Sequence, residues 1–408
     1  MYADLDENGK KRVKYELPKA DMHVHISMAW DDGRFIRAVK KGYTTLGPDF
    51  LTNRDNRYFA NLSEHHFAYE AARKKAQLTP VGLSDIVQTY LQKIAQQGAI
   101  YAEISNSFRS GSDFDWQMEA IAAGIDAANH NTGIESRIVV TTLRDHGHEQ
   151  AEKAAQHLAK VKYRHVTAFG LVGNEEKDDF YNYAKSFKIA YNDAGLGLAP
   201  HVAEQYPANA IGFLDALPKE ALNQSHTTDP RRTRAGHATT IHLSSDLMNE
   251  FAQNNICIES CISSNNRIGL PQRTLNYNIG DVIGSGADRQ FAVDRPLSTY
   301  FNDKIEQHPI TEFIQRGIPI CLGSDNPLLQ NTNISKEYSQ TLRAGVDQKL
   351  LLTFTENAIK FANIDNETRQ TLMGKVKEYE SRIKGNSPPS ATSNGYVHAS
   401  NFLTHPNR

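Results

Sequence analysis

Cysteine is scarce in this chain: only Cys257, Cys261 and Cys321 carry a thiol among 408 residues. Three cysteines cannot build the disulfide framework that stabilises small extracellular domains. We therefore expect reduced, structural thiols and a reducing compartment, and we place the protein in the cytoplasm.

Long apolar runs are missing as well, since none approaches the ~20 residues that a membrane helix needs. The N-terminus is polar and lacks the apolar region of a signal peptide. Charge of one sign is not in excess: the formal net charge is −2 and the isoelectric point is about 6.8. This balance gives no electrostatic reason to bind nucleic acid or a membrane surface, so the expected partner is a small molecule. The sequence predicts no particular oligomeric state.

The glycine-rich G-x-G-x-x-G motif and the P-loop are both absent after the predicted strands, which argues against an open doubly wound sheet. Instead, short apolar runs rich in β-branched residues alternate with amphipathic stretches. Eight such units in a row predict an α/β fold, the (β/α)8 TIM barrel. The predicted strands are 19–26, 99–105, 136–143, 165–172, 196–201, 233–237, 256–260 and 318–323, and the predicted helices include 83–97, 115–130, 150–161, 177–193 and 243–254.

Two connections are too long for a plain barrel. We expect the stretch 34–80 to be a helical insertion over the C-terminal face of the barrel, while the role of 267–308 is open. Residues 1–384 are assigned to a single barrel domain, and the polar stretch 385–408 to a flexible tail.

A pair of histidines, His23 and His25, is the strongest chemical signal. Side chains two apart on a strand point to the same face, so both imidazoles can converge on one metal ion. Active sites of such barrels lie where the strands end. Three other predicted strands also end in reactive groups, which are His201 with Glu204, His237, and Asp325 with Asn326. Any one of these groups alone is more often structural, but their joint placement on one rim predicts a metal-dependent active site.

The order of short motifs resembles the adenosine deaminase branch of the metal-dependent amidohydrolase superfamily over roughly 17–362. The family's Pro-Lys-x-Glu-Leu-His-x-His-Leu is similar to PKADMHVHI at 18–26, and its Tyr-x-Glu to YAE at 101–103. The remaining similar segments are LVGNE at 171–175, HVAE at 201–204, RAGHA at 234–238, ESCISSN at 259–265, SDNP at 324–327 and ENA at 356–358.

The resemblance implies the roles of the site residues. His23, His25, His201 and Asp325 would bind one Zn²⁺ per chain, which would lower the pKa of a water to about 7. His237 and Asp325 would orient the attacking hydroxide, and Glu204 would protonate the purine ring nitrogen. The implied reaction converts an adenine-containing nucleoside or nucleotide into the 6-oxo purine and ammonia. Gly173, through its backbone N–H, is the implied contact to the purine.

Departures from the family pattern fall at the positions that contact the substrate. Ser27 stands where the family has an Asp that contacts the ribose 5′-hydroxyl, and Asn326 replaces an Asp that contacts the base. Ala203, Ile262 and Gly170 are further departures. Loss of an acidic group near the 5′ position removes repulsion toward a phosphate, so we expect a 5′-phosphorylated or otherwise modified adenine nucleotide. Candidate phosphate contacts are Arg34, Lys40, Lys41, Arg267, Arg273, Arg289 and Arg295.

Two other kinds of zinc enzyme have motifs that this chain lacks. The Pro-Cys-x-x-Cys pair of cytidine-type zinc deaminases is missing, and His148-Glu149 lacks the second histidine of a His-Glu-x-x-His protease. Another amidohydrolase reaction on a C–N or ester bond, or a catalytically silent ligand-binding barrel, stays open. The histidines expected to be structural or at the surface are His65, His66, His157, His226, His242 and His308.

Overall fold

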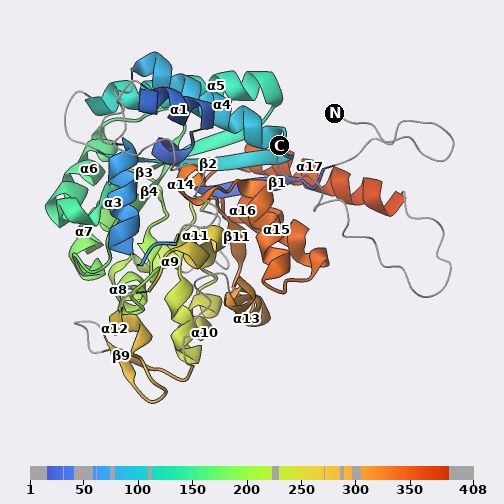
Figure 1. The fold of residues 1–408 in the computed structure, drawn as a ribbon. Helices are drawn as coiled ribbons and strands as arrows, with labels where there is room; N and C mark the ends of the chain where they lie inside the picture. Colours follow the sequence, from blue (N-terminus) through green and yellow to red (C-terminus); the bar gives the residue numbers. More distant parts are fainter. Residues whose placement is uncertain are drawn as a thin grey trace.

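The computed structural model describes residues 16–30, 32–40, 58–60, 62–73, 79–108, 113–222, 229–270, 272–284, 289–295 and 305–385. Parallel strands form a ring, and helices surround it (Figure 1). The strands are β1 Lys19–His25, β2 Ala99–Ser107, β3 Glu135–Leu143, β4 Val166–Val172, β5 Gly197–Leu198, β6 His201–Val202, β7 Arg234–His237, β8 Cys257–Ser260, β9 Val282–Gly284, β10 Gln290–Ala292 and β11 Ile320–Leu322.

The ring is made of two sheets that meet at both seams. One sheet has the order β1-β2-β3-β4-β5 and the other β11-β8-β7-β6. Isolated parallel bridges join Val24 to Asp325 and Leu198 to Thr233, and β5 continues into β6 after two residues. The predicted TIM barrel is therefore confirmed.

Helices follow the strands and cover the barrel from outside. Helix α4 begins after Thr79, whose hydroxyl accepts a hydrogen bond from Gly82 N, and buries one apolar side against the core. The helices are α1 Asp32–Lys40, α3 Leu62–Arg73, α4 Pro80–Ala95, α5 Asp113–Thr132, α6 His148–Lys160, α7 Ala184–Lys188, α8 Ala208–Ala216, α9 Lys219–Leu222, α10 Ser245–Gln253, α11 Ile262–Arg267, α12 Gln272–Leu275, α13 Ile310–Gln315, α14 Pro327–Gln330, α15 Ile334–Arg343, α16 Leu351–Phe361 and α17 Asn366–Gly385. None of the helices that the structure describes is long and apolar enough to cross a membrane.

Two predicted elements are wrong in detail. The predicted strand 196–201 is interrupted between β5 and β6, where Pro200 has no N–H to donate. The predicted helix 177–193 begins only at Phe180, with a 3₁₀ turn capped by Asp179, and ends as a π-helical turn over Ile189–Asp193. Side-chain periodicity does not distinguish a 3₁₀ turn or a π-helical turn from an α-helix, because each differs from the α-helix by less than one residue per turn.

The structure describes parts of the two long connections, 34–80 and 267–308. Helices α1 and α3 lie within the predicted insertion 34–80 and its approach, whereas 41–57 and 74–78 lie outside the described residues. The segment 267–308 holds α12, the antiparallel hairpin β9–β10 and a 3₁₀ turn at Ile305–Gln307. The hairpin projects at the lower edge of Figure 1. Apart from Gly385, the predicted tail lies outside the described residues.

The buried carboxyl group of Glu337, on α15, gives a stability prediction. Burial raises its pKa to about 7, and its two hydrogen-bond donors are Ser263 N (3.1 Å) and the Thr332 hydroxyl. An unfolded glutamate titrates near 4.5, so the folded form retains its proton between these values. The stability that Glu337 contributes to the fold is therefore fully present below about pH 4.5 and is lost as the pH rises through about 7.

We expect Glu337→Gln to stabilise the fold at pH 8, by about 3 kcal/mol at most, and to have little effect at pH 4.5. Thermal unfolding at both pH values measures this difference, with exposed Glu176→Gln as the control. An equal change in Tm at both pH values would contradict the assignment.

Candidate active site

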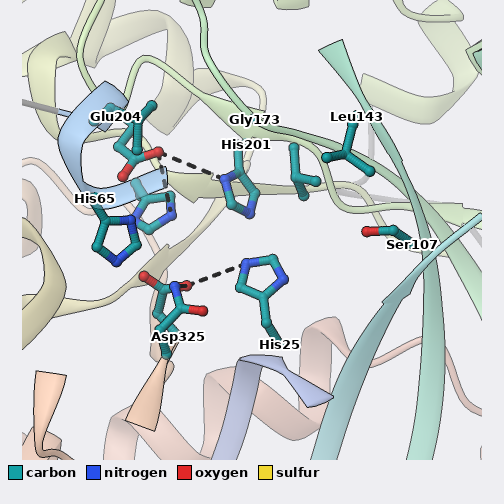
Figure 2. A pocket seen from close by; sticks show the side chains of 12 residues that line it. His25, His65, Ser107, Leu143, Gly173, His201, Glu204 and Asp325 are labelled. Carbon is teal, nitrogen blue, oxygen red and sulfur yellow. Dashed lines mark hydrogen bonds and ion pairs between the residues drawn. The ribbon is translucent and has the colours of Figure 1, made fainter. Parts of the chain in front are cut away.

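Four side chains of the types that bind metals converge at the seam between the two sheets. The ligand nitrogens of His23, His25 and His201 all lie within 4.8 Å of one another. Asp325 Oδ1 is 3.2 Å from His25 Nε2 and 3.9 Å from His23 Nε2. Figure 2 shows His25, His201 and Asp325 pointing toward a common space. The structure thus brings together all four predicted ligands.

Backbone hydrogen bonds fix this convergence. His25 N donates to Asp325 O (2.8 Å), and Asp325 N donates to His23 O (2.7 Å), so Asp325 lies directly beside strand β1. The approach requires Gly323, because a Cβ there would lie 2.3 Å from His23 Cβ. The ligand set is therefore positioned by the closure of the barrel.

The donor set fits a zinc ion. His23 Nε2 is buried and has no hydrogen-bond partner among the described residues, although a buried imidazole nitrogen normally has one. Three imidazoles and a carboxylate are typical zinc ligands, and they leave room for a water molecule. Burial would raise the pKa of Asp325, but the hydrogen bond from His25 and the nearby imidazoles hold it well below its usual range.

Two further groupings of possible ligands involve Cys261 or Glu204 together with His237. Burial and the nearby Asp325 raise the pKa of the Cys261 thiol well above its usual range, which favours the protonated thiol over the thiolate that binds metal. Burial together with Asp325 and Glu175 likewise raises the pKa of Glu204. The histidine and aspartate cluster is the better metal site.

A buried ionic chain lies behind His23. Glu259 Oε2 accepts a hydrogen bond from His23 Nδ1 (2.6 Å), which turns Nε2 toward the metal position. Arg234 Nε donates to Glu259 Oε1 (2.7 Å), and Arg234 also contacts Glu103. Burial would raise the pKa of Glu259, but Arg234 and the hydrogen bond with His23 lower it. An ionised Glu259 is thus positioned to set the tautomer of His23.

Glu259→Gln is expected to weaken metal affinity by about 10–100-fold, because the amide cannot hold His23 in the same tautomer with the same strength. Competition with a chromophoric chelator measures this affinity. An unchanged affinity would show that the hydrogen bond between Glu259 and His23 does not tune the site.

Glu204 and His237 lie beside the ligands without completing the ligand set. Glu204 Oε2 is 3.7 Å from both His201 Nδ1 and His237 Nε2. The raised pKa of Glu204 keeps a proton available, as a general acid requires. Burial and the neighbouring His23 lower the pKa of His237 to about 3. Burial therefore favours the protonated form of Glu204 and the neutral form of His237.

A second carboxylate, Glu175, holds the loop that carries Glu204. It accepts hydrogen bonds from the backbone N–H groups of Glu204 (3.2 Å), Gln205 (2.9 Å) and Tyr206 (2.9 Å). On the other side, Thr240 N donates to Ala203 O (2.9 Å). The backbone position of Glu204 is therefore fixed by a residue that follows β4.

We expect Glu175→Gln to lower kcat by about 10-fold or more with metal content retained, because an amide cannot accept three N–H donors. Steady-state kinetics and metal analysis measure the effect against the adjacent, exposed Glu176→Gln. If both variants matched the wild type, the loop would not depend on Glu175.

A cavity of about 550 Å³, including space open to solvent, is lined by His25, His201, Asp325, Glu204 and His237. Gly173 and Asn326, two of the predicted substrate contacts, line it, whereas Ser27 is not among its lining residues. Figure 2 shows His65, Ser107 and Leu143 around the space. Sequence reasoning missed these three and also Leu62 and Val172.

His65 was expected to be structural or at the surface, but it is buried and lines the cavity from α3. Its Nε2 is 3.3 Å from Gln330 Nε2, and the same Gln330 amide donates to Asp325 Oδ2 (3.3 Å). The only available signal was the placement of α3 within the insertion predicted to cover the barrel.

None of the predicted phosphate contacts whose side chains the structure describes lines this cavity. Arg289 pairs with Asp215 and Glu250, and Arg295 pairs with Glu312. No lysine or arginine of the described part of the chain lines the cavity. Lys41 and the side chains of Arg34 and Arg273 lie outside the described residues.

Comparison with known proteins agrees with this geometry. The family model described as adenosine deaminase matches residues 18–282 and 295–379. An adenine deaminase from Chelativorans sp. (strain BNC1) is 27% identical over 366 residues, covering 88% of this chain and 98% of that protein.

Two solved structures have similar folds. The N6-methyl-AMP deaminase from Arabidopsis thaliana has a TM-score of 0.67 at 16% identity and covers 90% of this chain and 98% of its own. A zinc-bound amidohydrolase from Burkholderia ambifaria has a TM-score of 0.68 at 16% identity and covers 94% and 99%. Because the family model matches most of its length, this chain belongs to the adenosine deaminase family, whose members hydrolytically deaminate adenine-type substrates.

Proposed function

We propose that this protein catalyses the zinc-dependent hydrolytic deamination of an adenine-containing nucleoside or nucleotide to the 6-oxo purine and ammonia. The observation that carries the proposal is one cavity lined by His25, His201 and Asp325, three of the four proposed metal ligands, and by the carboxyl group of Glu204, whose pKa is raised by burial. Zinc, held by His23, His25, His201 and Asp325, would activate a water as the nucleophile.

The chain's own residues supply the remaining parts. Glu204 donates its proton to the purine ring nitrogen beside the amino-bearing carbon, which makes that carbon electrophilic. His237 and Asp325 orient the attacking water from the opposite side. Gly173 lines the cavity and has a φ of +98°, a backbone conformation that favours glycine, and its backbone N–H is the proposed contact to the purine.

The substrate class is the finer part of the proposal. A nucleotide is supported by a structural neighbour that is an N6-methyl-AMP deaminase. In the sequence, Ser27 brings no negative charge to the segment that follows β1, although its side chain lies outside the described cavity lining. Free adenine is the second candidate, because the relative from Chelativorans sp. is an adenine deaminase and no lysine or arginine of the described residues lines the cavity.

Ammonia release by the zinc-loaded protein from adenine, adenosine, deoxyadenosine, AMP and N6-methyl-AMP tests both parts. The proposal expects kcat/KM for a nucleoside or nucleotide to exceed that for adenine. Turnover of adenine alone would overturn the substrate class and leave deamination standing. No turnover with any of the five would overturn the proposed reaction.

A further inference from the structure

A buried histidine outside the ligand set, His308, lies behind the active site. It follows the 3₁₀ turn Ile305–Gln307, at the end of the long segment between β8 and β11, and is 3% exposed. Its Nδ1 accepts a hydrogen bond from the backbone N–H of Ile310 (3.2 Å). Because a backbone N–H can only donate, Nδ1 carries no hydrogen, and neutral His308 carries its hydrogen on Nε2.

That hydrogen determines the orientation of the next side chain. His308 Nε2 lies 3.5 Å from Asn265 Oδ1, which is the acceptor atom of the amide. A flipped Asn265 would place two donors face to face, so the amide oxygen faces His308. Burial, together with the nearby His242, lowers the pKa of His308 to about 3, which keeps the ring neutral.

The other end of Asn265 reaches the active site. Its Nδ2 lies 3.3 Å from His237 Nδ1. Since an amide nitrogen only donates, His237 Nδ1 is the acceptor, and the hydrogen of the neutral His237 ring is on Nε2. His237 Nε2 is buried without a hydrogen-bond partner among the described residues, 3.7 Å from Glu204 Oε2.

We propose that His308 is a positioning residue of the reaction, which acts through Asn265 to hold His237 with its Nε2–H directed at the attacking water. The inference rests on the function proposed above and assigns a role to the end of the 267–308 segment. A neutral imidazole with hydrogen on Nε2 donates a hydrogen bond to the water oxygen and takes no proton at that atom. His237 therefore orients the nucleophile as a donor.

The direct test is the imidazole tautomer, read by nitrogen NMR of ¹⁵N-histidine-labelled protein with and without zinc. The His237 signals are assigned by their loss in His237→Gln. We expect Nε2 to be protonated and Nδ1 to be unprotonated in the wild type, in both metal states. In Asn265→Asp the carboxylate accepts from Nδ1–H, so the tautomer should reverse. Nδ1 protonation in the wild type, or the same tautomer in Asn265→Asp, would overturn the proposal.

A pair of His308 variants separates positioning from folding. His308→Gln keeps an amide donor near the position of Nε2 and should retain the tautomer. His308→Phe removes the donor and should lower kcat by about 10-fold or more, with KM and zinc content little changed. Equal kinetics for the two variants, or a loss that follows thermal stability alone, would contradict the role of His308.

The two proposals can fail separately. If no substrate is deaminated but the tautomer reverses in Asn265→Asp, the proposed function fails while the orientation of His237 stands. If Glu204→Gln abolishes turnover while the His308 and Asn265 variants leave kcat and tautomer unchanged, only the positioning role fails.

Discussion

Replacement of Glu204 by glutamine is expected to lower kcat by about a thousand-fold or more, while zinc content and Tm stay at the wild-type values. The amide has nearly the same shape as the protonated acid, but it cannot transfer a proton to the ring nitrogen. Burial and two neighbouring carboxylates raise the pKa of Glu204, which favours the protonated acid that this step needs.

Steady-state ammonia release and metal analysis on the same preparation measure this effect. Glu176→Gln is the matched control, because the side chain of Glu176 is exposed and has no part in the proposed reaction. Persistence of wild-type turnover in Glu204→Gln would remove Glu204 from the mechanism. Loss of zinc together with turnover would instead make Glu204 part of the metal site.

His201→Ala is expected to reduce bound zinc from one per chain to a small fraction and to bring turnover below detection. His201 supplies one of three imidazoles, and its ring centroid lies 4.6 Å from that of His23 and 5.4 Å from that of His25. Burial and the adjacent His23 and His237 lower the pKa of His201 well below its usual range. This favours the neutral imidazole, which has one unprotonated ring nitrogen that can bind metal.

Zinc stoichiometry by atomic absorption after equilibrium dialysis measures this prediction. His130→Ala is the control, because His130 is exposed near the end of α5. Full zinc occupancy in His201→Ala would mean that the ion binds elsewhere, with the grouping of His23, His237 and Cys261 as the alternative to examine.

The barrel and the shared rim were predictable because they follow local rules. Each strand is a short apolar run and strand ends meet on one rim, which predicts that His23, His25, His201 and Asp325 lie together. Their role as the metal ligands was implied by the resemblance to the family and stays a prediction. The π-helical turn at Ile189–Asp193 was not predicted, because it depends on how the backbone packs rather than on side-chain periodicity. The interruption at Pro200 had a signal in the sequence, since proline has no N–H for the strand ladder, but the apolar run alone did not show it.

The residues that orient the site were harder to predict. Glu175 contacts the backbone of Glu204, 29 positions away, and His308 contacts Asn265, 43 positions away. No local pattern marks such pairs, since each depends on how loops from different strands meet. His308 was expected to be structural or at the surface. Only the hydrogen bond that Ile310 N donates to its Nδ1 shows which ring nitrogen carries the hydrogen.

The most direct test of the central claim is deamination in water enriched in ¹⁸O. The zinc-loaded protein is incubated with the best substrate of the five-compound panel, and the product is analysed by mass spectrometry. The account predicts a 6-oxo purine that carries one ¹⁸O atom for each ammonia released, and no such product from Glu204→Gln. A product without ¹⁸O, or the absence of ammonia from every adenine-type substrate, would contradict it.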